Sequence, residues 1–431
     1  MESLSKEIID RDFYRWSVYG LFVTCNTFGF FIAMTIGILL PSIADEFSLS
    51  PTSQGIFGSS PYWAYILLTL VITWWVTRYS PKVIVAVTML LSSLCLAFQG
   101  WAPTFFFLLI GRLLFGITMI AREAAGPLII RQWLTQREVN LAGGVENLVF
   151  GFIVSSGILV TPELLDIFGG DWRPVMKILA LVFLLLIGLW LVLVKDREIT
   201  AEVQKNGNTS YVEKNNQGLS RSILKKALSY KEVWIASFGF CGAFMAFTSF
   251  NSFLPTMFLE SYGISLSKSS FVAASYVFPG GISGIIAGYY IRGKEMRTPV
   301  LVIAGAVIAI TFLGMTYTEN YLFLLILGSI NGLAWGFFPI LYMVPYHLDD
   351  IRPREIAVAV ALVWTIASLG LSIGPYLTGY IQEVTDDLRL SLRIVALAPI
   401  TVLIAGLMLK LTENSKNGDI KFPDKKCEAI L

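Results

Sequence analysis

Twelve apolar stretches of about twenty residues each run through this 431-residue chain, and they constrain its fold more than any other feature. The hydrocarbon core of a bilayer is roughly 30 Å thick and a helix rises about 1.5 Å per residue, so about twenty apolar residues cross it. Charged residues make up 14% of the chain, whereas soluble proteins carry about a quarter. The sequence therefore predicts an all-α membrane protein with twelve transmembrane helices.

The expected spans form two groups of six. They cover residues 18–40, 53–77, 83–102, 105–130, 139–165, 174–194, 232–259, 269–291, 299–317, 320–345, 355–382 and 390–410. A polar stretch separates the groups, which predicts a six-helix bundle over 1–195, a linker over 196–231, a second bundle over 232–411 and a tail over 412–431. Within the solvated linker we expect a short amphipathic helix at Ser222–Leu228.

The basic residues are distributed unequally between the turns. If the N-terminus is cytoplasmic, 25 of the 32 Lys and Arg residues fall in cytoplasmic segments and five on the other side. This bias predicts that both termini and the linker are cytoplasmic. We separately expect the chain in the plasma membrane, or in the inner membrane if it is bacterial. A net charge of +2 without a basic patch does not indicate a nucleic-acid partner.

Four charged side chains lie deep inside the expected spans, away from the span ends: Arg112, Arg122 and Glu123 in span 105–130, and Glu146 in span 139–165. Each costs about 2.5–3.5 kcal/mol at a helix centre, so these residues are the main functional candidates. Arg112 and Glu123 share a helix face and are separated along the axis by roughly 16 Å. Arg122 and Glu146 are expected at the same depth, which predicts a buried ion pair between them.

The roles of these charges remain open at this point. Arg112 either braces its helix through backbone carbonyls or lines the transport pathway, and the Arg122–Glu146 pair is either static or functional. Glu123 has no evident partner, and a desolvated carboxylate can take up and release protons, so it is the first candidate for proton coupling, with Glu146 as the second. Three asparagines are weaker candidates for substrate contact: Asn26, Asn251 and Asn331. They are weaker because an asparagine in a membrane helix more often forms an interhelical hydrogen bond.

Short motifs recur at turns and helix ends. Two of them are matching turns, TWWVTRYSPK (Thr73–Lys82) and GYYIRGKEMR (Gly288–Arg297). Five further motifs are GRLLFG (Gly111–Gly116), LTQREVNLAGG (Leu134–Gly144), GGDWR (Gly169–Arg173), SFLPTMFLESYGISLSKSS (Ser252–Ser270) and SLGLSIGPYLTGYI (Ser368–Ile381). With these motifs the chain resembles the major facilitator superfamily over roughly residues 15–411. In the first turn Arg78 and Lys82 match the family signature, whereas Thr73, Thr77 and Ser80 replace its Gly, Asp and second Gly.

The resemblance implies two pseudo-symmetric six-helix bundles. The six-plus-six arrangement suggests a substrate site between them near the midplane, and we expect a monomer. The turns around spans four to seven are similar to those of branches that move organic anions with protons, although Met119 stands where those branches usually carry an acid. Two arginines in the first bundle favour an anion, because a guanidinium pairs well with a carboxylate. We therefore expect proton symport of a small organic anion by alternating access.

Two other functions remain as alternatives. A drug/proton antiporter would usually carry a Gly-Pro-x-x-Gly-Gly run where this chain has TPELLD, and a non-transporting membrane sensor would usually carry a soluble output domain. An enzyme is not expected, because the sequence shows no nucleophile–base set. With a single histidine and no Cys cluster, no metal or other cofactor is expected either.

Overall fold

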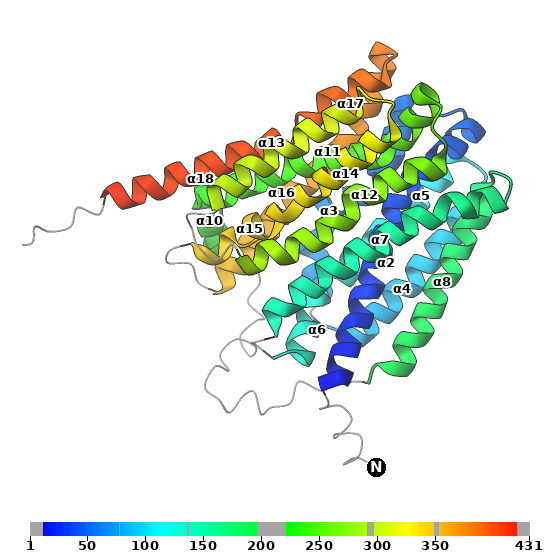
Figure 1. Ribbon diagram of the computed structural model, residues 1–431. Helices are drawn as coiled ribbons and strands as arrows, with labels where there is room; N and C mark the ends of the chain where they lie inside the picture. Colours follow the sequence, from blue (N-terminus) through cyan, green and yellow to red (C-terminus); the bar gives the residue numbers. More distant parts are fainter. Residues whose placement is uncertain are drawn as a thin grey trace, which may run out of the picture.

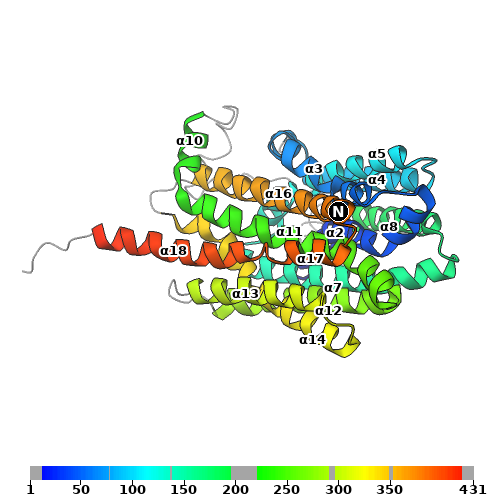
Figure 2. The same ribbon diagram turned by 90° about the horizontal axis from the view of Figure 1, so that it is seen from above.

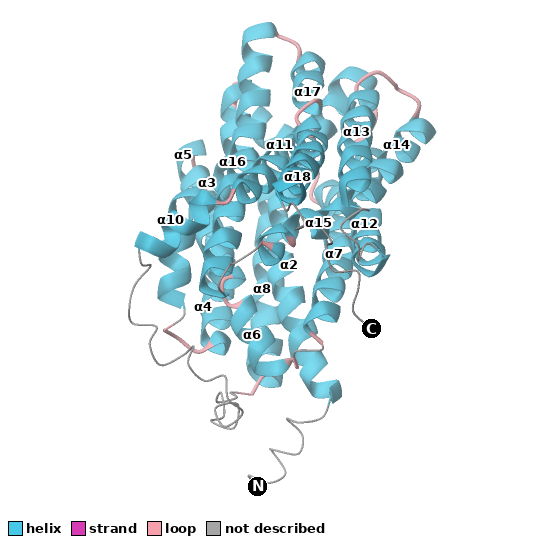
Figure 3. Ribbon diagram, turned by 90° about the vertical axis from the view of Figure 1, so that its left-hand side faces the viewer, coloured by secondary structure: helices cyan, strands magenta, loops and turns pink. Residues whose placement is uncertain are grey.

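The computed structural model describes residues 12–76, 78–135, 138–195, 221–290, 297–348 and 353–419. These residues form helices joined by short turns, without strands (Figure 3). Thr77, residues 291–296 of the second turn motif, the linker over 196–220 and the tail from 420 lie outside the described residues, together with the predictions made for them.

The N-terminal bundle consists of six membrane helices, one of them in two parts. They are α2 (Asp12–Phe47), α3 (Pro51–Val76), α4 (Pro81–Gly100), α5 (Phe105–Glu123) with its continuation α6 (Gly126–Trp133), α7 (Val139–Ile167) and α8 (Trp172–Leu193).

The C-terminal bundle repeats this plan. Its helices are α11 (Lys231–Tyr262), α12 (Leu266–Tyr290), α13 (Arg297–Met315), α14 (Tyr321–Ala334) followed by η3 (Trp335–Phe337), α15 (Phe338–Tyr342) and η4 (Val344–His347), then α16 (Pro353–Thr385), and α17 (Leu388–Ala396) with α18 (Ile400–Asp419). A short helix, α10 (Arg221–Ser229), precedes this bundle and covers the segment predicted to be amphipathic.

The all-α fold of two six-helix bundles is confirmed. Within the described residues, eleven helical segments are long and apolar enough to cross a membrane. The remaining predicted span corresponds to α3, a helix of 26 residues that interrupts its aliphatic residues with Ser, Tyr, Thr and Trp. It packs between α5 of its own bundle and α16 of the other, so it belongs to the same layer of spanning helices.

Three of the predicted continuous spans are broken, each beside a proline. Pro127 follows the turn between α5 and α6, Pro339 stands at the start of α15, and Pro399 lies between α17 and α18. Proline cannot donate the backbone hydrogen bond that continues a helix, and its ring clashes with the preceding turn. The first of these breaks places Glu123 at the very end of α5, which the span prediction did not show.

The two bundles lie side by side, meeting at one end and diverging at the other (Figure 1). We call the end where α2 begins and α8 ends the terminal face; there the Tyr14 hydroxyl donates a 2.6 Å hydrogen bond to the Leu193 carbonyl oxygen. The last helix, α18, ends on the corresponding side of the C-terminal bundle (Figure 1). The other end is the opposite face. The bundles diverge toward the terminal face.

Three helix pairs hold the bundles together in a contact zone that we call the seam: α2 with α11, α3 with α16, and α7 with α12 (Figure 2). Glycines permit the close approach. A Cβ atom on Gly37 would lie 1.9 Å from the carbonyl oxygen of Asn251, and one on Gly379 would lie 2.1 Å from that of Pro51. At these points backbone packs directly on backbone.

Two carboxylates also cross the seam near the opposite face. Glu383, near the end of α16, accepts a 3.0 Å hydrogen bond from the backbone N–H of Thr52 in the first turn of α3. Glu163, near the end of α7, accepts one of 3.1 Å from the hydroxyl of Ser267 in the first turn of α12. Because α3 and α12 are the second spans of their bundles, and α7 and α16 the fifth, the two contacts are related by the pseudo-symmetry of the fold.

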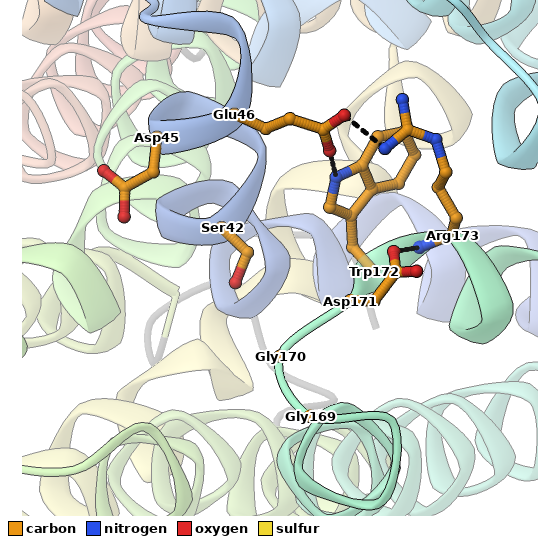
Figure 4. Close-up of a pocket in the computed structure, with 8 residues that line it drawn as sticks. All are labelled: Ser42, Asp45, Glu46, Gly169, Gly170, Asp171, Trp172 and Arg173. Atoms are coloured by element: carbon orange, nitrogen blue, oxygen red, sulfur yellow. Dashed lines mark hydrogen bonds and ion pairs between the residues drawn. The ribbon is translucent and has the colours of Figure 1, made fainter.

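The GGDWR sequence fixes α8 against α2 at the opposite face. The two glycines, residues 169–170, have φ angles of +62° and +88°, which residues with a side chain rarely adopt. Asp171 caps α8 by accepting a 2.9 Å hydrogen bond from the backbone N–H of Arg173. Glu46 at the end of α2 accepts hydrogen bonds from the Trp172 indole, at 2.8 Å, and from the Arg173 guanidinium (Figure 4).

Candidate transport site

Glu123 lies at the end of α5 with a partly buried side chain. The hydroxyl of Tyr65 on α3, a residue that is 6% exposed, donates a 2.8 Å hydrogen bond to Glu123 Oε2. Sequence analysis found no partner for this carboxylate. A tyrosine in the middle of an apolar span was the available signal, because a buried hydroxyl usually finds a hydrogen-bond partner.

Glu146 lies on α7 and its side chain is exposed. It interacts electrostatically with Glu123, with Tyr19 of α2 and with Tyr342 of α15. Tyr342 belongs to the C-terminal bundle and interacts with Glu123 as well. Both carboxylates therefore interact with a residue of the other bundle, and the side chain of Glu146 is exposed.

Arg122 does not pair with Glu146, so this prediction was wrong. The Arg122 side chain is 0% exposed, and its Nη1 donates a 3.1 Å hydrogen bond to Ser92 Oγ on α4. Its Cζ lies 5.5 Å from the ring centroid of Phe183 on α8. Equal depth in the membrane does not fix the direction in which each helix faces: α5 turns Arg122 into its own bundle, whereas Glu146 faces the other bundle.

A glycine on α2 gives Arg122 its place. A Cβ atom on Gly29 would lie 2.3 Å from Arg122 Nη2, so any side chain there would displace the guanidinium. Next to this group, the hydroxyls of Ser92 and Thr118 lie 2.6 Å apart, within hydrogen-bond distance. The guanidinium is thus held among α2, α4 and α8. Sequence reasoning missed Gly29 because nothing in the pattern of apolar residues places it opposite Arg122.

Arg112 is also 0% exposed. Its Nη2 donates a 3.1 Å hydrogen bond to the carbonyl oxygen of Ala33 on α2, and its Cζ lies 5.1 Å from the ring centroid of Phe57 on α3. This bond to a backbone carbonyl is the contact that a bracing role would require. Arg112 lies on the α5 face shared with Glu123, but it is sealed within the N-terminal bundle.

Among the described residues, no carboxylate oxygen lies within 4.0 Å of a guanidinium nitrogen of either arginine. Two buried nitrogens of each guanidinium, Nε and Nη1 of Arg112 and Nε and Nη2 of Arg122, also have no hydrogen-bond partner there. Removing a charge from water without a counter-ion costs several kcal/mol. The N-terminal bundle therefore holds two buried positive charges without a close ion pair among the described residues, although Arg122 interacts electrostatically with Glu123.

The three candidate asparagines differ in their contacts. Asn331 on α14 is 0% exposed. Its amide nitrogen donates a 2.8 Å hydrogen bond to the Thr311 hydroxyl oxygen on α13, and its amide oxygen accepts one of 3.2 Å from the Trp335 indole. Asn251 on α11 donates a 2.8 Å hydrogen bond across the seam to the Met34 carbonyl oxygen. Asn26 is 8% exposed on α2, and its amide forms no hydrogen bond with the described residues. Two of the three thus form interhelical bonds, and Asn26 keeps its polar atoms free.

The C-terminal bundle contributes aromatic rings to this region. Phe244 on α11 makes angles of 21° with Trp335 and 15° with Trp364 on α16, with ring centroids 6.0 Å apart in both pairs. Phe338 packs against Phe244 and Trp364, and Tyr342 lies 6.3 Å from Trp364 between centroids. We call these five residues the aromatic wall. Tyr342 is the residue of the wall that interacts electrostatically with Glu123 and Glu146.

At the terminal face, the LTQREVNLAGG sequence ties the start of α7 to α2. Glu138 accepts hydrogen bonds from the backbone N–H of Thr135, at 2.6 Å, from the Thr135 hydroxyl, at 2.7 Å, and from Arg15, at 2.5 Å. The hydrogen bonds from Thr135 and the charge of Arg15 hold the pKa of Glu138 below its usual value. Arg15 also donates to the Trp133 carbonyl oxygen at 2.8 Å, so α2, α6 and α7 are joined here.

Two pseudo-symmetric six-helix bundles with ionisable groups at membrane depth are an arrangement found in secondary transporters. The family model of the Major Facilitator Superfamily matches residues 21–375, and the chain belongs to this superfamily. It is thus a multi-pass membrane transport protein and not an enzyme. Membership of a transporter family leaves the sensor alternative without support.

Three curated relatives align with most of the chain. The uncharacterized transporter YybO of Bacillus subtilis (strain 168) is 26% identical over 435 residues, covering 95% of this chain and 94% of YybO. The probable galactarate/D-glucarate transporter GudP of the same strain is 22% identical over 424 residues, covering 92% and 91%. The benzoate transport protein of Acinetobacter baylyi (strain ATCC 33305 / BD413 / ADP1) is 20% identical over 400 residues, covering 85% and 84%.

Solved structures share the fold. A bacterial homolog of the human lysosomal transporter Spinster, in an inward-facing and unoccupied conformation, superposes with a TM-score of 0.69 and 17% sequence identity. The match covers 95% of this chain and 99% of that one. At this level of identity the similarity concerns the arrangement of the helices.

Proposed function

We propose that this chain moves small organic carboxylates together with protons by alternating access. The observation that carries the proposal is the pair of buried guanidinium groups without a close ion pair among the described residues, in the same bundle as two carboxylates, Glu123 and Glu146, that interact with Tyr342 of the other bundle. The names of two relatives agree with an anionic substrate, because galactarate, D-glucarate and benzoate all carry carboxylates.

The charges explain why protons would accompany the anion. At an effective dielectric constant near 20, two unit charges 4 Å apart interact by about 4 kcal/mol. A substrate carboxylate drawn toward Arg122 meets repulsion of this order from ionised Glu123 and Glu146. Protonation of these acids removes the repulsion, so the anion and the proton bind together more favourably than either alone.

Residue roles follow from exposure and contacts. Glu123 and Glu146 are the proton acceptors, and Arg122, with two bare nitrogens, is the anion-binding group once its bundle opens around it. Asn26, whose amide is free, adds a hydrogen bond to the solute. Arg112 supports the site by bracing α5 against α2. Asn251 and Asn331 hold the helices that line it.

The described conformation is one end of the cycle. Its seam is closed near the opposite face, and its bundles diverge toward the terminal face (Figure 1). Because the basic residues are concentrated on the terminal side, we assign that face to the cytoplasm, which makes the conformation inward-facing. The chain works as a monomer in the plasma membrane, or in the inner membrane of a bacterium.

Reconstituted vesicles test this proposal. An inward proton gradient should drive accumulation of labelled benzoate or D-glucarate by the purified chain. Glu123→Gln should abolish accumulation against a gradient while preserving exchange of internal for external carboxylate, because exchange needs no net proton movement. Glu319→Gln, at an exposed residue between α13 and α14, is the matched control. Gradient-driven accumulation by Glu123→Gln would remove that residue from the coupling mechanism.

The drug/proton antiporter remains the second candidate, and one observation favours it. The two carboxylates interact with Tyr342 of the aromatic wall, and acids beside aromatic rings also bind organic cations. Expulsion of a cationic dye from the same vesicles under a proton gradient, without carboxylate uptake, would replace symport of anions by this function.

A further inference from the structure

We infer that the aromatic wall makes the transporter selective for carboxylates that carry a planar apolar ring, and that it discriminates against polyhydroxylated acids. This inference rests on the proposed function, since it specifies which carboxylates occupy the proposed site. The relatives' names leave the two classes open, because one names a benzoate transporter and another a galactarate/D-glucarate transporter.

The first argument is the orientation of the rings. Trp335, Phe244 and Trp364 lie in nearly parallel planes, and Phe240 continues the set at 8° to Trp364 and 15° to Phe244. Trp335 and Trp364 are partly exposed, so ring surface is left uncovered by protein. Aromatic pairs prefer offset-stacked or edge-on arrangements, and an aligned set of rings offers such a partner to one more planar group.

The second argument is that three hydrogen-bond donors beside these rings are already paired within the protein. Thr365 donates its hydroxyl to the Ala361 carbonyl oxygen at 2.8 Å, and Ser368 donates to that of Trp364 at 2.7 Å. The Trp335 indole donates to Asn331 at 3.2 Å. These three donors beside the wall are thus already used. A sugar acid would leave its hydroxyl groups in water and find few replacements, and unpaired polar groups are strongly disfavoured in a binding site.

The third argument is the division of chemistry between the bundles. The rings belong to the C-terminal bundle, whereas Arg122, Glu123 and Glu146 belong to the N-terminal bundle. Tyr342, on the edge of the wall, interacts with both acids and marks where the two surfaces meet. A molecule with a ring at one end and a carboxylate at the other therefore contacts both bundles at once, which is what a ligand needs if its binding is to draw them together.

The first experiment measures selectivity in the unaltered chain. Benzoate, cyclohexanecarboxylate and D-glucarate are compared as competitors of labelled benzoate uptake in proteoliposomes with an inward proton gradient. Cyclohexanecarboxylate has a ring of similar size and the same charge, but it is not planar and has no π system. We expect the half-inhibitory concentration of benzoate to be about tenfold lower than that of cyclohexanecarboxylate. The half-inhibitory concentration of D-glucarate should be the highest of the three.

The second experiment locates that selectivity. Phe244→Leu and Trp364→Leu should each raise the half-saturating benzoate concentration by about five- to tenfold and leave that of cyclohexanecarboxylate within about twofold. Phe238→Leu is the matched control, because Phe238 lies on the same helix as Phe244 but is 54% exposed and packs against Trp234 instead of the wall. A loss that affects both carboxylates equally in the wall variants would overturn the inference.

The outcomes separate this inference from the proposed function. Proton-driven uptake of carboxylates with equal preference for all three, or with preference for D-glucarate, refutes the role of the wall and leaves symport of organic anions standing. Absence of any carboxylate uptake by a chain that still moves another solute refutes both. The measurement on the unaltered chain decides the question even if a wall variant does not fold.

Discussion

The glycine contacts of the seam predict that Gly37→Ala will open the opposite face. The new Cβ atom would lie 1.9 Å from the Asn251 carbonyl oxygen, which is about 1.5 Å short of the 3.4 Å at which ordinary contact begins. Because the obstructing atom belongs to the backbone of α11, the helices must separate. Overpacking of this kind costs about 1–3 kcal/mol.

That cost falls on the conformation with the seam closed and not on a conformation in which α2 and α11 have parted. A difference of 1–3 kcal/mol shifts a two-state equilibrium by about 5- to 150-fold. Gly37→Ala should therefore populate a conformation that is open at the opposite face, and it should slow net uptake because the return step becomes unfavourable. The effect does not require any change in substrate affinity at the central site.

The shift can be measured as a distance between spin labels. Thr104→Cys and Glu319→Cys, introduced into a variant without the four native cysteines, place labels on exposed residues of the two bundles at the opposite face. Gly20→Ala is the matched control, because Gly20 is also on α2 and a Cβ atom there would meet nothing within 4 Å. We expect a longer-distance population with Gly37→Ala and none with Gly20→Ala. Identical distributions in the two variants would refute the reasoning.

Three further substitutions test the site and the seam. Tyr65→Phe removes the donor of the 2.8 Å hydrogen bond to Glu123, and because hydrogen bonds to charged groups contribute about 1.5–3 kcal/mol, we expect the rate of proton-driven uptake to fall at least about tenfold. Gly29→Ala puts a Cβ atom 2.3 Å from Arg122 Nη2 and should lower thermal stability, by about 1–3 kcal/mol in unfolding free energy. Glu383→Ala removes the cap on α3 and should raise the long-distance population of the same label pair about fivefold, as expected for the loss of about 1 kcal/mol.

Each of these predictions has a control and a contrary result. Tyr62→Phe changes a neighbouring tyrosine whose hydroxyl does not contact Glu123, so equal losses in both variants would contradict the role of the hydrogen bond. Gly188→Ala, in open surroundings on α8, should leave the melting temperature unchanged. Glu383→Gln keeps an acceptor oxygen, so its long-distance population should lie between those of the unaltered chain and Glu383→Ala. A larger population for Gln than for Ala would show that the cap is not responsible.

The membrane helices were predictable because the bilayer imposes its thickness on the sequence. Apolar runs of about twenty residues and the polar break after span six led to the two bundles, which the structure confirms. The breaks beside Pro127, Pro339 and Pro399 were not predicted as helix ends, because a proline in a membrane span also occurs within continuous helices, as Pro255 does in α11.

The charged residues were identifiable, but their partners were not. Spacing along one helix gives the face and depth of Arg122, yet the partner depends on how neighbouring helices are rotated, and this brought Ser92 and Gly29 next to it in place of Glu146. The bond from Tyr65 to Glu123 joins residues 58 positions apart, and no pattern within either helix predicts it. Local periodicity fixes which face a residue is on, whereas packing between helices decides what it meets.

The direct backbone contacts of the seam have an electrical consequence. At Gly37 and Gly379 the backbones of the facing helices are in direct contact, which leaves no room at these two points for a file of water molecules that could relay protons. We therefore expect the seam to insulate at these points, where each elementary charge that crosses the membrane exchanges about 2.3 kcal/mol with the field per 100 mV. A proton current that bypasses the solute would have to begin with a breach of this insulation, so the glycines that let the helices touch also protect the stored energy of the gradient.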